Sequence, residues 1–259
     1  MLLVTLTSDF GNKDHYVAAL KAGILNTNPN IKIVDISHDI EPFNISHGAY
    51  VLRSVFREFP KGSVHVVALD TYTPKWGAIA MKLEEHYFVA PDNGILSLLS
   101  EQTPKPVINI NQLNPTRSIF PAKNLYANIA ANIASGKDLH ELGPPQENWT
   151  QLLNRKIKTT KALISGHVIR IDHYGNLITN IPKSEFDTIS LLNKNNGFQI
   201  TLGRERINTI HSTYHSVDPG ECFCIFNDNG LLEIGINSGN ASNLLGIQFD
   251  SPITLNFNQ

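Results

Sequence analysis

Two aspartates follow strand-like runs and are the first candidates for chemistry. Asp9 comes after the apolar, β-rich run Leu2–Thr7, and Asp70 comes after a second run, Val64–Leu69. In parallel α/β sheets, ligands bind beside the carboxyl ends of the strands, so both carboxylates would stand where ligands bind. A carboxylate at Asp9 could hold the two hydroxyls of a ribose ring. The structural alternative is a helix N-cap or Asx turn at Asp9 and a turn-forming role for Asp70.

A third polar turn, Val89–Gly94, follows another strand-like run. It contains Asp92, Asn93 and Gly94, which is the composition of a plain tight turn. If it lay beside Asp9 together with the turn at Asp70, the three loops would form a polar crevice.

The second half of the chain places an acid, an aromatic ring and an amide within five residues, at Asp172, Tyr174 and Asn176. Asp and Asn side chains can read the exchangeable edges of a sugar or a base, and Tyr can stack on a ring. Taken alone, such a segment is more often a simple hairpin turn. The segment Asn237–Ala241 is a similar polar turn.

Several common cofactor motifs are missing from the sequence. It contains no HExxH, CxxC or DxDxDG pattern, and its ten histidines are scattered, so no metal site is predicted. It also lacks GxGxxG and GxxxxGK[ST], which argues against a Rossmann dinucleotide site and a P-loop.

The elements of the first half alternate between strands and helices. Helices are expected at Asp14–Leu25, His47–Phe59 and Leu125–Ala134, and strands at Leu2–Thr7, Ile31–Ile36, Val64–Leu69, Ala78–Lys82 and Tyr87–Ala90. This alternation predicts an α/β domain with a mainly parallel sheet.

The pattern changes after the segment Gly143–Asn148, whose Gly, Pro and polar residues are typical of a linker. Short β runs separated by turns then predict an all-β, barrel-like domain. The runs are Lys161–Asp172, Leu177–Ile181, Phe198–Leu202, Glu221–Asn227 and Leu231–Ile236. We therefore expect an α/β domain over residues 1–150 and a barrel-like domain over 158–259, with the boundary between about 145 and 160.

Composition narrows the class of protein. The formal net charge is −2 over 259 residues, which predicts no binding to nucleic acid or to an anionic membrane. No run approaches the roughly 20 apolar residues of a membrane helix, and the N-terminus lacks the basic region of a signal peptide. Cys222 and Cys224 stand two apart on one expected strand, where a mutual disulfide is unfavourable, so a reduced cytoplasmic protein is expected.

Read in order along the chain, the motifs resemble the S-adenosylmethionine hydroxide adenosyltransferase (SAM hydrolase) family, which includes the related fluorinases and chlorinases. The resemblance covers nearly the whole chain and is carried by TLTSDFG (residues 5–11), VDISHDIEPFNI (34–45), FPKGSVHVVALD (59–70), VAPDNGILS (89–97), IDHYGNLITNI (171–181) and NSGNASNLLG (237–246).

The resemblance implies a homotrimer that binds S-adenosylmethionine between the N-terminal domain of one chain and the C-terminal domain of its neighbour. Asp9 would hold the ribose hydroxyls, and Phe43 would line the pocket. Asp172, Tyr174 and Asn176 would bind the methionine part and the adenine. No cofactor is implied, because S-adenosylmethionine is itself the substrate.

Asp70 stands where the hydrolases of this family carry the aspartate that handles the attacking water. The halogenases carry a tyrosine there, since a carboxylate would repel a halide. The resemblance therefore implies hydrolysis of S-adenosylmethionine to adenosine and methionine. A non-catalytic adenosine- or S-adenosylmethionine-binding protein is the main alternative, and halogenation is a lesser one.

Three positions depart from the family pattern. Where the hydrolases have an arginine after the aspartate, this chain offers Lys75, a point charge in place of a planar fork. Pro121 occupies the position of the active-site histidine and has no side-chain hydrogen-bonding group. Asp228 lies where the family binds the methionine carboxylate, which an acidic side chain would repel. The catalytic candidates are thus Asp70 and Lys75.

Overall fold

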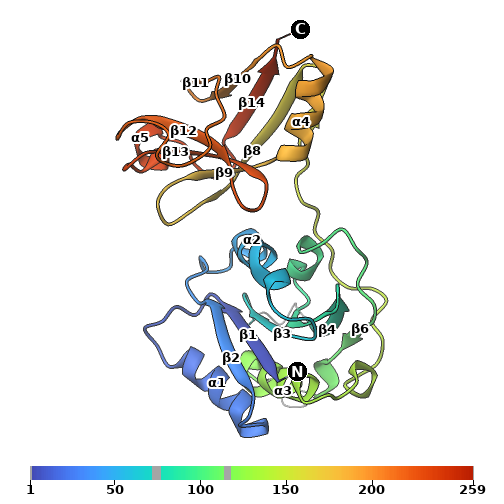
Figure 1. Ribbon diagram of the computed structural model, residues 1–259. Helices are drawn as coiled ribbons and strands as arrows, with labels where there is room; N and C mark the ends of the chain where they lie inside the picture. Colours follow the sequence, from blue (N-terminus) through green and yellow to red (C-terminus); the bar gives the residue numbers. More distant parts are fainter. Residues whose placement is uncertain (1, 72–76, 114–117, 259) are drawn as a thin grey trace. The chain divides into compact units, whose positions relative to one another are not determined.

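The computed structural model describes residues 2–71, 77–113 and 118–258 (Figure 1). The chain divides into two compact units, Met1–Asn154 and Arg155–Gln259, called here the N-terminal and C-terminal units. No helix in the described parts of the chain has both the length and the apolar character that a membrane span requires.

The N-terminal unit is built on a six-stranded sheet with the order β2-β1-β3-β5-β4-β6. β1 pairs in parallel with β2 and β3, and β3 pairs in parallel with β5, whereas β4 runs antiparallel to both β5 and β6. The sheet is thus mainly parallel, as the alternation of elements predicts. Its strands are β1 (Leu3–Ser8), β2 (Lys32–Ser37), β3 (Val64–Ala68), β4 (Ala78–Leu83), β5 (His86–Pro91) and β6 (Val107–Asn109).

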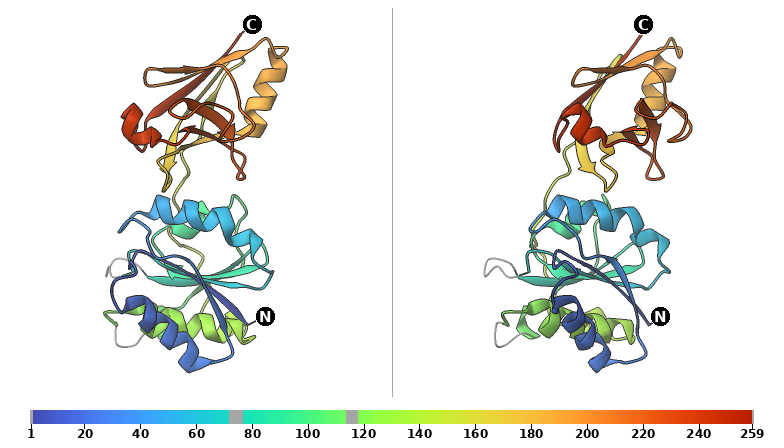
Figure 2. Two further views of the ribbon diagram at one scale, coloured as in Figure 1. Left: turned by 60° about the vertical axis from the view of Figure 1, so that its left-hand side comes forward. Right: turned by 90° about the vertical axis from the view of Figure 1, so that its left-hand side faces the viewer.

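Helices cover both faces of this sheet, and side-chain alternation along the strands explains why (Figures 1 and 2). In β3, Val64 and Val66 belong to the core shared with α1 (Tyr16–Thr27) and α3 (Ala127–Ala134), whereas Val67 belongs to the core shared with α2 (Ile45–Val55). The shorter helices are η1 (Phe56–Glu58), η2 (Ile95–Leu98), η3 (Asn111–Leu113), η4 (Ala122–Tyr126) and η5 (Leu139–Glu141).

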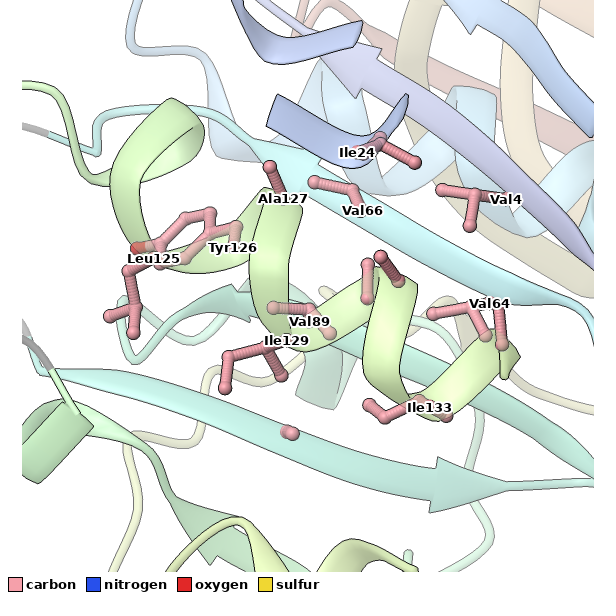
Figure 3. Packing of buried hydrophobic residues seen from close by; sticks show 14 of the residues in the cluster. Val4, Ile24, Val64, Val66, Val89, Leu125, Tyr126, Ala127, Ile129 and Ile133 are labelled. Atoms are coloured by element: carbon pink, nitrogen blue, oxygen red, sulfur yellow. The ribbon is translucent and has the colours of Figure 1, made fainter. Parts of the chain in front are cut away.

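Figure 3 shows the core beneath α3. The π-helical turn η4 leads directly into α3 and places Tyr126 in the interior, where its side chain is 1% exposed. Ile129 and Ile133 lie on the same side of α3 and pack with valines of β1, β3 and β5. The core therefore fixes the strands whose carboxyl ends carry the candidate site.

The C-terminal unit is an antiparallel, nearly closed barrel-like sheet with the strand order β11-β10-β14-β8-β9-β13-β12, and β7 pairs with β8. Beyond β11 the chain reaches the other end of the sheet, where the backbone nitrogen of His211 donates to the Cys224 carbonyl at 2.6 Å. The elements are β7 (Lys158–Thr159), β8 (Leu163–Ile171), β9 (Leu177–Pro182), α4 (Lys183–Leu192), β10 (Phe198–Leu202), β11 (Glu205–Ile207), β12 (Cys222–Phe226), β13 (Leu231–Ile236), α5 (Ala241–Leu245) and β14 (Pro252–Phe257).

Some expectations need correction. The sequence pattern did not predict β6, β7, β11, β14, α4 or α5. The segment Gly143–Asn148, predicted to be a linker, instead lies along β6: the Asn109 nitrogen donates to the Pro144 carbonyl at 2.9 Å, and the Gln146 nitrogen donates to the Val107 carbonyl at 2.8 Å. Both cysteines are free thiols, as expected.

A buried histidine pair lies inside the N-terminal unit. His65 Nδ1 lies 2.7 Å from the Thr5 hydroxyl, and His65 Nε2 lies 3.2 Å from His86 Nδ1. His65 is 0% exposed and His86 is 3% exposed. Burial, together with the neighbouring His86, lowers the pKa of His65 to about 3. The unfolded chain therefore binds a proton here at a higher pH than the folded chain.

We expect this pair to make folding sensitive to mild acid. The contribution of the neutral histidines to the free energy of unfolding should be fully present above the unfolded histidine pKa of about 6.5. Below that pH the free energy of unfolding should fall by up to about 1.4 kcal/mol per pH unit for each such group. His65→Gln should flatten this dependence between about pH 6.5 and 5. Urea unfolding at several pH values measures it, with pH 8, where the histidine is neutral in both states, as the reference. An unchanged slope in the variant would show that other groups cause the acid sensitivity.

Candidate functional site

Asp9 lies directly after β1 and holds two other loops through one oxygen. Its Oδ2 accepts a hydrogen bond from the backbone nitrogen of Phe43 at 3.1 Å and another from that of Asp70 at 3.3 Å. Phe43 belongs to the loop between β2 and α2, and Asp70 follows β3. The structure thus brings three of the sequence-predicted site residues, Asp9, Phe43 and Asp70, to one place.

Phe43 and Asp70 both have left-handed backbone conformations, with φ of 64° and 48°. Residues other than glycine seldom adopt this conformation, and each instance costs on the order of 1–3 kcal/mol. Their backbone N–H groups point at a carboxylate, and such charge-assisted bonds are stronger than neutral ones. The Phe43 ring is 73% exposed, so it is available to a ligand.

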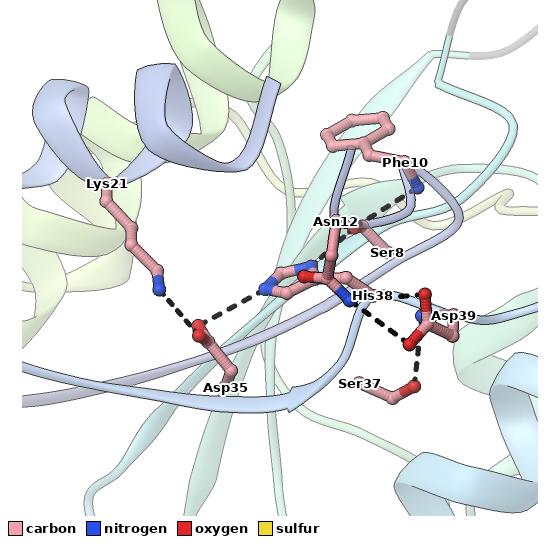
Figure 4. A network of polar contacts seen from close by, with 8 residues as sticks. All are labelled: Ser8, Phe10, Asn12, Lys21, Asp35, Ser37, His38 and Asp39. Atoms are coloured by element: carbon pink, nitrogen blue, oxygen red, sulfur yellow. Dashed lines mark hydrogen bonds and ion pairs between the residues drawn. The ribbon is translucent and has the colours of Figure 1, made fainter. Parts of the chain in front are cut away.

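A polar chain fixes the turn that carries Asp9 (Figure 4). Ser8 Oγ lies 2.6 Å from His38 Nδ1, and His38 Nε2 lies 3.2 Å from Asp35 Oδ1. Lys21 Nζ lies 2.5 Å from Asp35 Oδ2. Burial acts to raise the pKa of Asp35, but the hydrogen bonds from Lys21 and His38 outweigh it and the pKa is lowered.

This chain has the order Ser–His–Asp found in hydrolytic triads, but it does not form a nucleophilic centre. Ser8 is 0% exposed and His38 is 3% exposed, so no substrate can reach the hydroxyl. The His38 ring lies between Asp35 and Ser8, with Nε2 facing Asp35 and Nδ1 facing the Ser8 hydroxyl. Ser8 Oγ in turn accepts from the Phe10 nitrogen at 3.4 Å, which holds the turn around Asp9.

Two positions that depart from the family pattern are Lys75 and Pro121. Lys75, the second catalytic candidate, lies outside the described residues. Pro121 directly precedes η4 and has helical backbone angles, φ −59° and ψ −36°. A proline is accommodated at the start of a helix because its missing N–H needs no partner there.

In the C-terminal unit, Asp172 organises the turn between β8 and β9. Its Oδ1 accepts from the backbone nitrogens of Tyr174 at 2.9 Å and Asn176 at 2.8 Å, and its Oδ2 accepts from Asn176 Nδ2 at 3.2 Å. The Tyr174 side chain is 74% exposed, whereas Asn176 is 6% exposed. The three residues predicted together are therefore together, with the aromatic ring outward and the amide inward.

Sequence reasoning missed Glu233, the buried acid of this region. Glu233 on β13 is 3% exposed; Asn227 Nδ2 donates to its Oε2 at 2.9 Å, while its Oε1 is buried without a hydrogen-bond partner. Burial raises the pKa of Glu233, and the negative charge of Asp172 adds to the rise. The hydrogen bond from Asn227 opposes it, as do weaker contacts with the Tyr214 hydroxyl and the Asn176 amide, but the pKa stays raised. The only signal in the sequence is one acid within an otherwise apolar strand.

Tyr214 lies near the same group of acids. Burial raises the pKa of Tyr214, and the negative charges of Glu233, Asp172 and Asp228 raise it further. Asp228, a predicted site residue, lies exposed in the turn between β12 and β13. The charges of three carboxylates therefore raise the pKa of one tyrosine, and this region is rich in acidic side chains.

A glycine on β13 makes room for Asn176. A Cβ at Gly235 would lie 2.4 Å from Asn176 Oδ1 and 2.1 Å from the Phe223 ring, closer than real atoms approach. Phe223 packs edge-on against Tyr214, with ring centroids 5.3 Å apart. The outer face of β13 is thus shaped so that an amide, an aromatic ring and the buried acid share one surface.

The chemistry available is that of carboxylates, amides and aromatic rings. Among the described residues no group of three or more His, Cys, Asp or Glu is arranged to hold a metal ion. The N-terminal set suits a polyhydroxylated ligand such as a sugar, and the C-terminal set suits a ligand with a ring and hydrogen-bond donors. The fold is that of a two-domain protein, and each of the two residue sets has the composition of a site for a small polar ligand.

The chain belongs to the SAM hydroxide adenosyltransferase family. The model of the N-terminal domain of that family matches residues 4–143, and the model of its C-terminal domain matches residues 166–254. The resemblance inferred from the motifs is thereby confirmed.

Individual relatives agree with this membership. A protein from Methanocaldococcus jannaschii named (R)-S-adenosyl-L-methionine hydrolase is 36% identical over 95% of this chain and 93% of its own length. A fluorinase from an Actinoplanes species is 26% identical, over 77% of this chain and 76% of its own. A solved structure of an uncharacterized conserved protein from Thermotoga maritima superimposes with a TM-score of 0.86 at 30% identity, covering 98% of this chain and 99% of the other.

The half-partnered acid leads to a prediction about stability. A raised folded-state pKa means that ionised Glu233 destabilises the fold at neutral pH, and that this cost fades as the pH falls toward the ordinary glutamate value of 4.5. Glu233→Gln should therefore raise the free energy of unfolding at pH 8, with a gain that shrinks toward pH 4.5. Urea unfolding measures both values.

Glu147→Gln, at an exposed position of the N-terminal unit, is the matched control and should change the free energy of unfolding by less than about 0.5 kcal/mol. A loss of stability in Glu233→Gln at pH 8 would contradict the interpretation, because it would mean that the ionised carboxylate is well compensated in the free protein.

Proposed function

We propose that this chain hydrolyses S-adenosylmethionine to adenosine and L-methionine. The observation that carries the proposal is the meeting of Asp9 and Asp70 at the carboxyl edge of the parallel strands β1 and β3, where Asp9 Oδ2 lies 3.3 Å from the Asp70 nitrogen. The relative named as an (R)-S-adenosyl-L-methionine hydrolase supports the same reaction.

In this reaction the oxygen of water or hydroxide forms a bond to the 5′ carbon of the ribose while the bond from that carbon to sulfur breaks. The electron pair of the broken bond goes to sulfur, which leaves as the neutral thioether of methionine. No acid is needed to protonate it. The proton of the attacking water passes to the Asp70 carboxylate and then to solvent. Catalysis therefore depends on holding the nucleophile in line and desolvating it.

Asp70 favours water over halide as the nucleophile. A carboxylate repels a halide but accepts a hydrogen bond from water and can take its proton. The side chain is half-buried, so water can approach it. Halogenation is accordingly the weaker alternative.

In this proposal Asp9 divides its two oxygens between the protein and the substrate. Oδ2 accepts the N–H groups of Phe43 and Asp70, whereas Oδ1 makes no hydrogen bond within the described residues. Oδ1 is thus the oxygen that the ribose hydroxyls would meet, and the exposed Phe43 ring would lie along the ligand.

The C-terminal residues would bind the two ends of the substrate. Asn176 would read the edge of the adenine, and Tyr174 would stack on a flat group. Asp172, Asp228 and Glu233 suit a ligand that carries a positive sulfonium and a positive ammonium group. A donor from the ligand would also supply the partner that Glu233 Oε1 lacks.

The departures from the family pattern bear on rate. With Pro121 in place of the histidine, and with Lys75 as the only cation offered in place of the arginine, Asp70 is the principal group left to act on water. We therefore propose a slow hydrolase. A purely binding protein is the alternative, and the measurements below separate the two.

The active form is proposed to be a homotrimer with shared sites. Asp9 and Asp70 lie in the N-terminal unit, whereas Asp172 and Asn176 lie in the C-terminal unit. A ring of three chains would pair the first set of one chain with the second set of its neighbour through a heterologous interface. Light scattering should then give three times the chain mass of 28.7 kDa.

The cytoplasm is the proposed location. Cys222 and Cys224 are both free, and Cys224 is fully buried, where burial raises the pKa of its thiol far above the ordinary value. Such a thiol is unreactive and belongs to the core. A protein whose two cysteines stay unpaired suits a reducing compartment.

The first test concerns Asp70. Asp70→Asn should lower the single-turnover rate of adenosine formation by about 10²–10⁴-fold, because a positioned general base contributes about that much. Binding should change little, since the amide keeps the size of the side chain. Chromatography follows adenosine, and calorimetry gives the affinity separately.

Two outcomes would contradict the proposed mechanism. If Asp70→Asn keeps the full rate, the carboxylate is only a turn residue. If the natural chain binds S-adenosylmethionine but never releases adenosine and methionine, the binding-protein alternative holds.

The second test concerns the shared sites. Asp70→Asn and Asn176→Ala should each be nearly inactive alone, yet an equimolar mixture refolded together should regain about one quarter of the normal activity, since about that share of all sites combines two intact halves when subunits mix at random. The chains are unfolded together and refolded, and each variant refolded alone is the control. Failure to recover activity in verified mixed trimers would place each site within a single chain.

A further inference from the structure

The peptide group that joins Leu69 to Asp70 is held at both of its polar ends by side chains. At the Asp70 end, its N–H donates to Asp9 Oδ2 at 3.3 Å. At the Leu69 end, its carbonyl accepts from Asn93 Nδ2 at 3.1 Å. Asp9 follows β1 and Asn93 follows β5, so the flanking strands clamp the peptide that leaves β3 between them.

The orientation of the Asn93 amide is fixed by a second bond. Its Oδ1 accepts from the backbone nitrogen of Ile95 at 3.2 Å, which leaves Nδ2 as the group that faces the Leu69 carbonyl. Asn93 is 1% exposed, so water cannot replace either bond. The turn at Asn93, whose composition is that of a plain tight turn, thus holds a buried donor against the residue before Asp70.

The clamp acts where the sheet no longer holds the chain. β3 ends at Ala68, so Leu69 and Asp70 have left the strand ladder. Asp70 then takes a left-handed conformation, with φ of 48°. A residue in this region persists only where its surroundings determine it strongly. Fixing the preceding peptide plane limits the direction in which the Asp70 side chain can leave the backbone.

Packing holds the side chain of Leu69 as well. A Cβ at Gly48 on α2 would lie 2.4 Å from Leu69 Cδ2 and 3.2 Å from Ile95 Cδ1, so the helix comes into close contact with both. Leu69 is 0% exposed. The peptide plane and the side chain before Asp70 are therefore both immobilised, and Asp70 stands on a rigid base.

We propose that Asn93 is a positioning residue for the catalytic carboxylate of Asp70. It acts by holding the Leu69 carbonyl, and it does not itself touch the substrate. This inference rests on the proposed function, in which Asp70 takes the proton of the attacking water. A displacement of about 1 Å in such a group costs on the order of 10²-fold in rate.

The test compares Asn93→Ala with a matched control. Asn93→Ala should lower kcat by about 10- to 100-fold while KM changes by less than about threefold, because the groups that bind the substrate remain. Asn109→Ala is the control. Its Oδ1 likewise accepts from a backbone nitrogen two residues on, that of Asn111 at 2.9 Å, but it lies on β6 away from Asp70. It should keep kcat within about twofold.

A double-mutant cycle separates positioning from general damage. In the Asp70→Asn background, Asn93→Ala should lower the remaining rate by less than about twofold, because no catalytic carboxylate is left to misplace. An equal loss in both backgrounds would overturn the inference, since the effect would then not pass through Asp70. A normal kcat in Asn93→Ala would overturn it as well.

These outcomes are distinct from failure of the proposed function. If Asp70→Asn alone keeps the full rate, the hydrolase mechanism fails before Asn93 is tested. If Asn93→Ala does not fold, Asn93→Ser replaces it, since its hydroxyl can still accept from Ile95 but is too short to hold the Leu69 carbonyl. Asn93→Ser should then show the same loss of kcat with a normal thermal transition, and a normal kcat there would contradict the proposal.

Discussion

Asp9 Oδ2 accepts the backbone N–H groups of Phe43 and Asp70, and the geometry of the candidate site depends on this one oxygen. Both donors belong to left-handed residues, each of which costs on the order of 1–3 kcal/mol. Hydrogen bonds to a charged group contribute about 1.5–3 kcal/mol each, which is enough to offset that cost. Two loops from distant parts of the chain therefore keep unfavourable backbone conformations because they share Asp9 as an acceptor.

The position of Asp9 depends in turn on an edge strand. β2 carries Asp35, and His38 follows it directly; together they connect Lys21 on α1 to Ser8 at the end of β1. Except at Ile33, Ile36 and Ser37, the side chains of β2 are exposed, so packing contributes less here than in the central strands. Charged and polar contacts therefore hold this edge strand in place, whereas core packing holds the central strands. The last of these contacts is made by Ser8, the residue before Asp9.

The sequence could predict the place of Asp9 and Asp70 because strand periodicity and the rule for parallel sheets together locate strand ends. It could not predict that their link is backbone to side chain, since this requires left-handed angles at Phe43 and Asp70, residue types that rarely adopt them. β6 and β11 have three residues each, too few to show a period. β14 begins with a proline, which weakens the signal of a strand.

The burial of Glu233 also could not be predicted from the sequence. Strand alternation puts it on the face of β13 opposite Leu232 and Ile234, which belong to the core, and that would ordinarily mean exposure to solvent. Its burial involves the segment of Tyr214 and the turn of Asn176, which are distant in sequence. The alternation of residues along one strand carries no information about distant segments that cover its outer face.

The acids of the candidate sites differ in how well their oxygens are partnered. Asp9 receives backbone N–H groups on one oxygen, and both oxygens of Asp172 are hydrogen-bonded. Glu233 keeps one buried oxygen without a partner, which costs on the order of 1–3 kcal/mol or more for a charged group. In the proposed function, a cationic ligand would supply the partner that the buried Oε1 of Glu233 lacks, so part of the free energy of binding would come from satisfying this carboxylate.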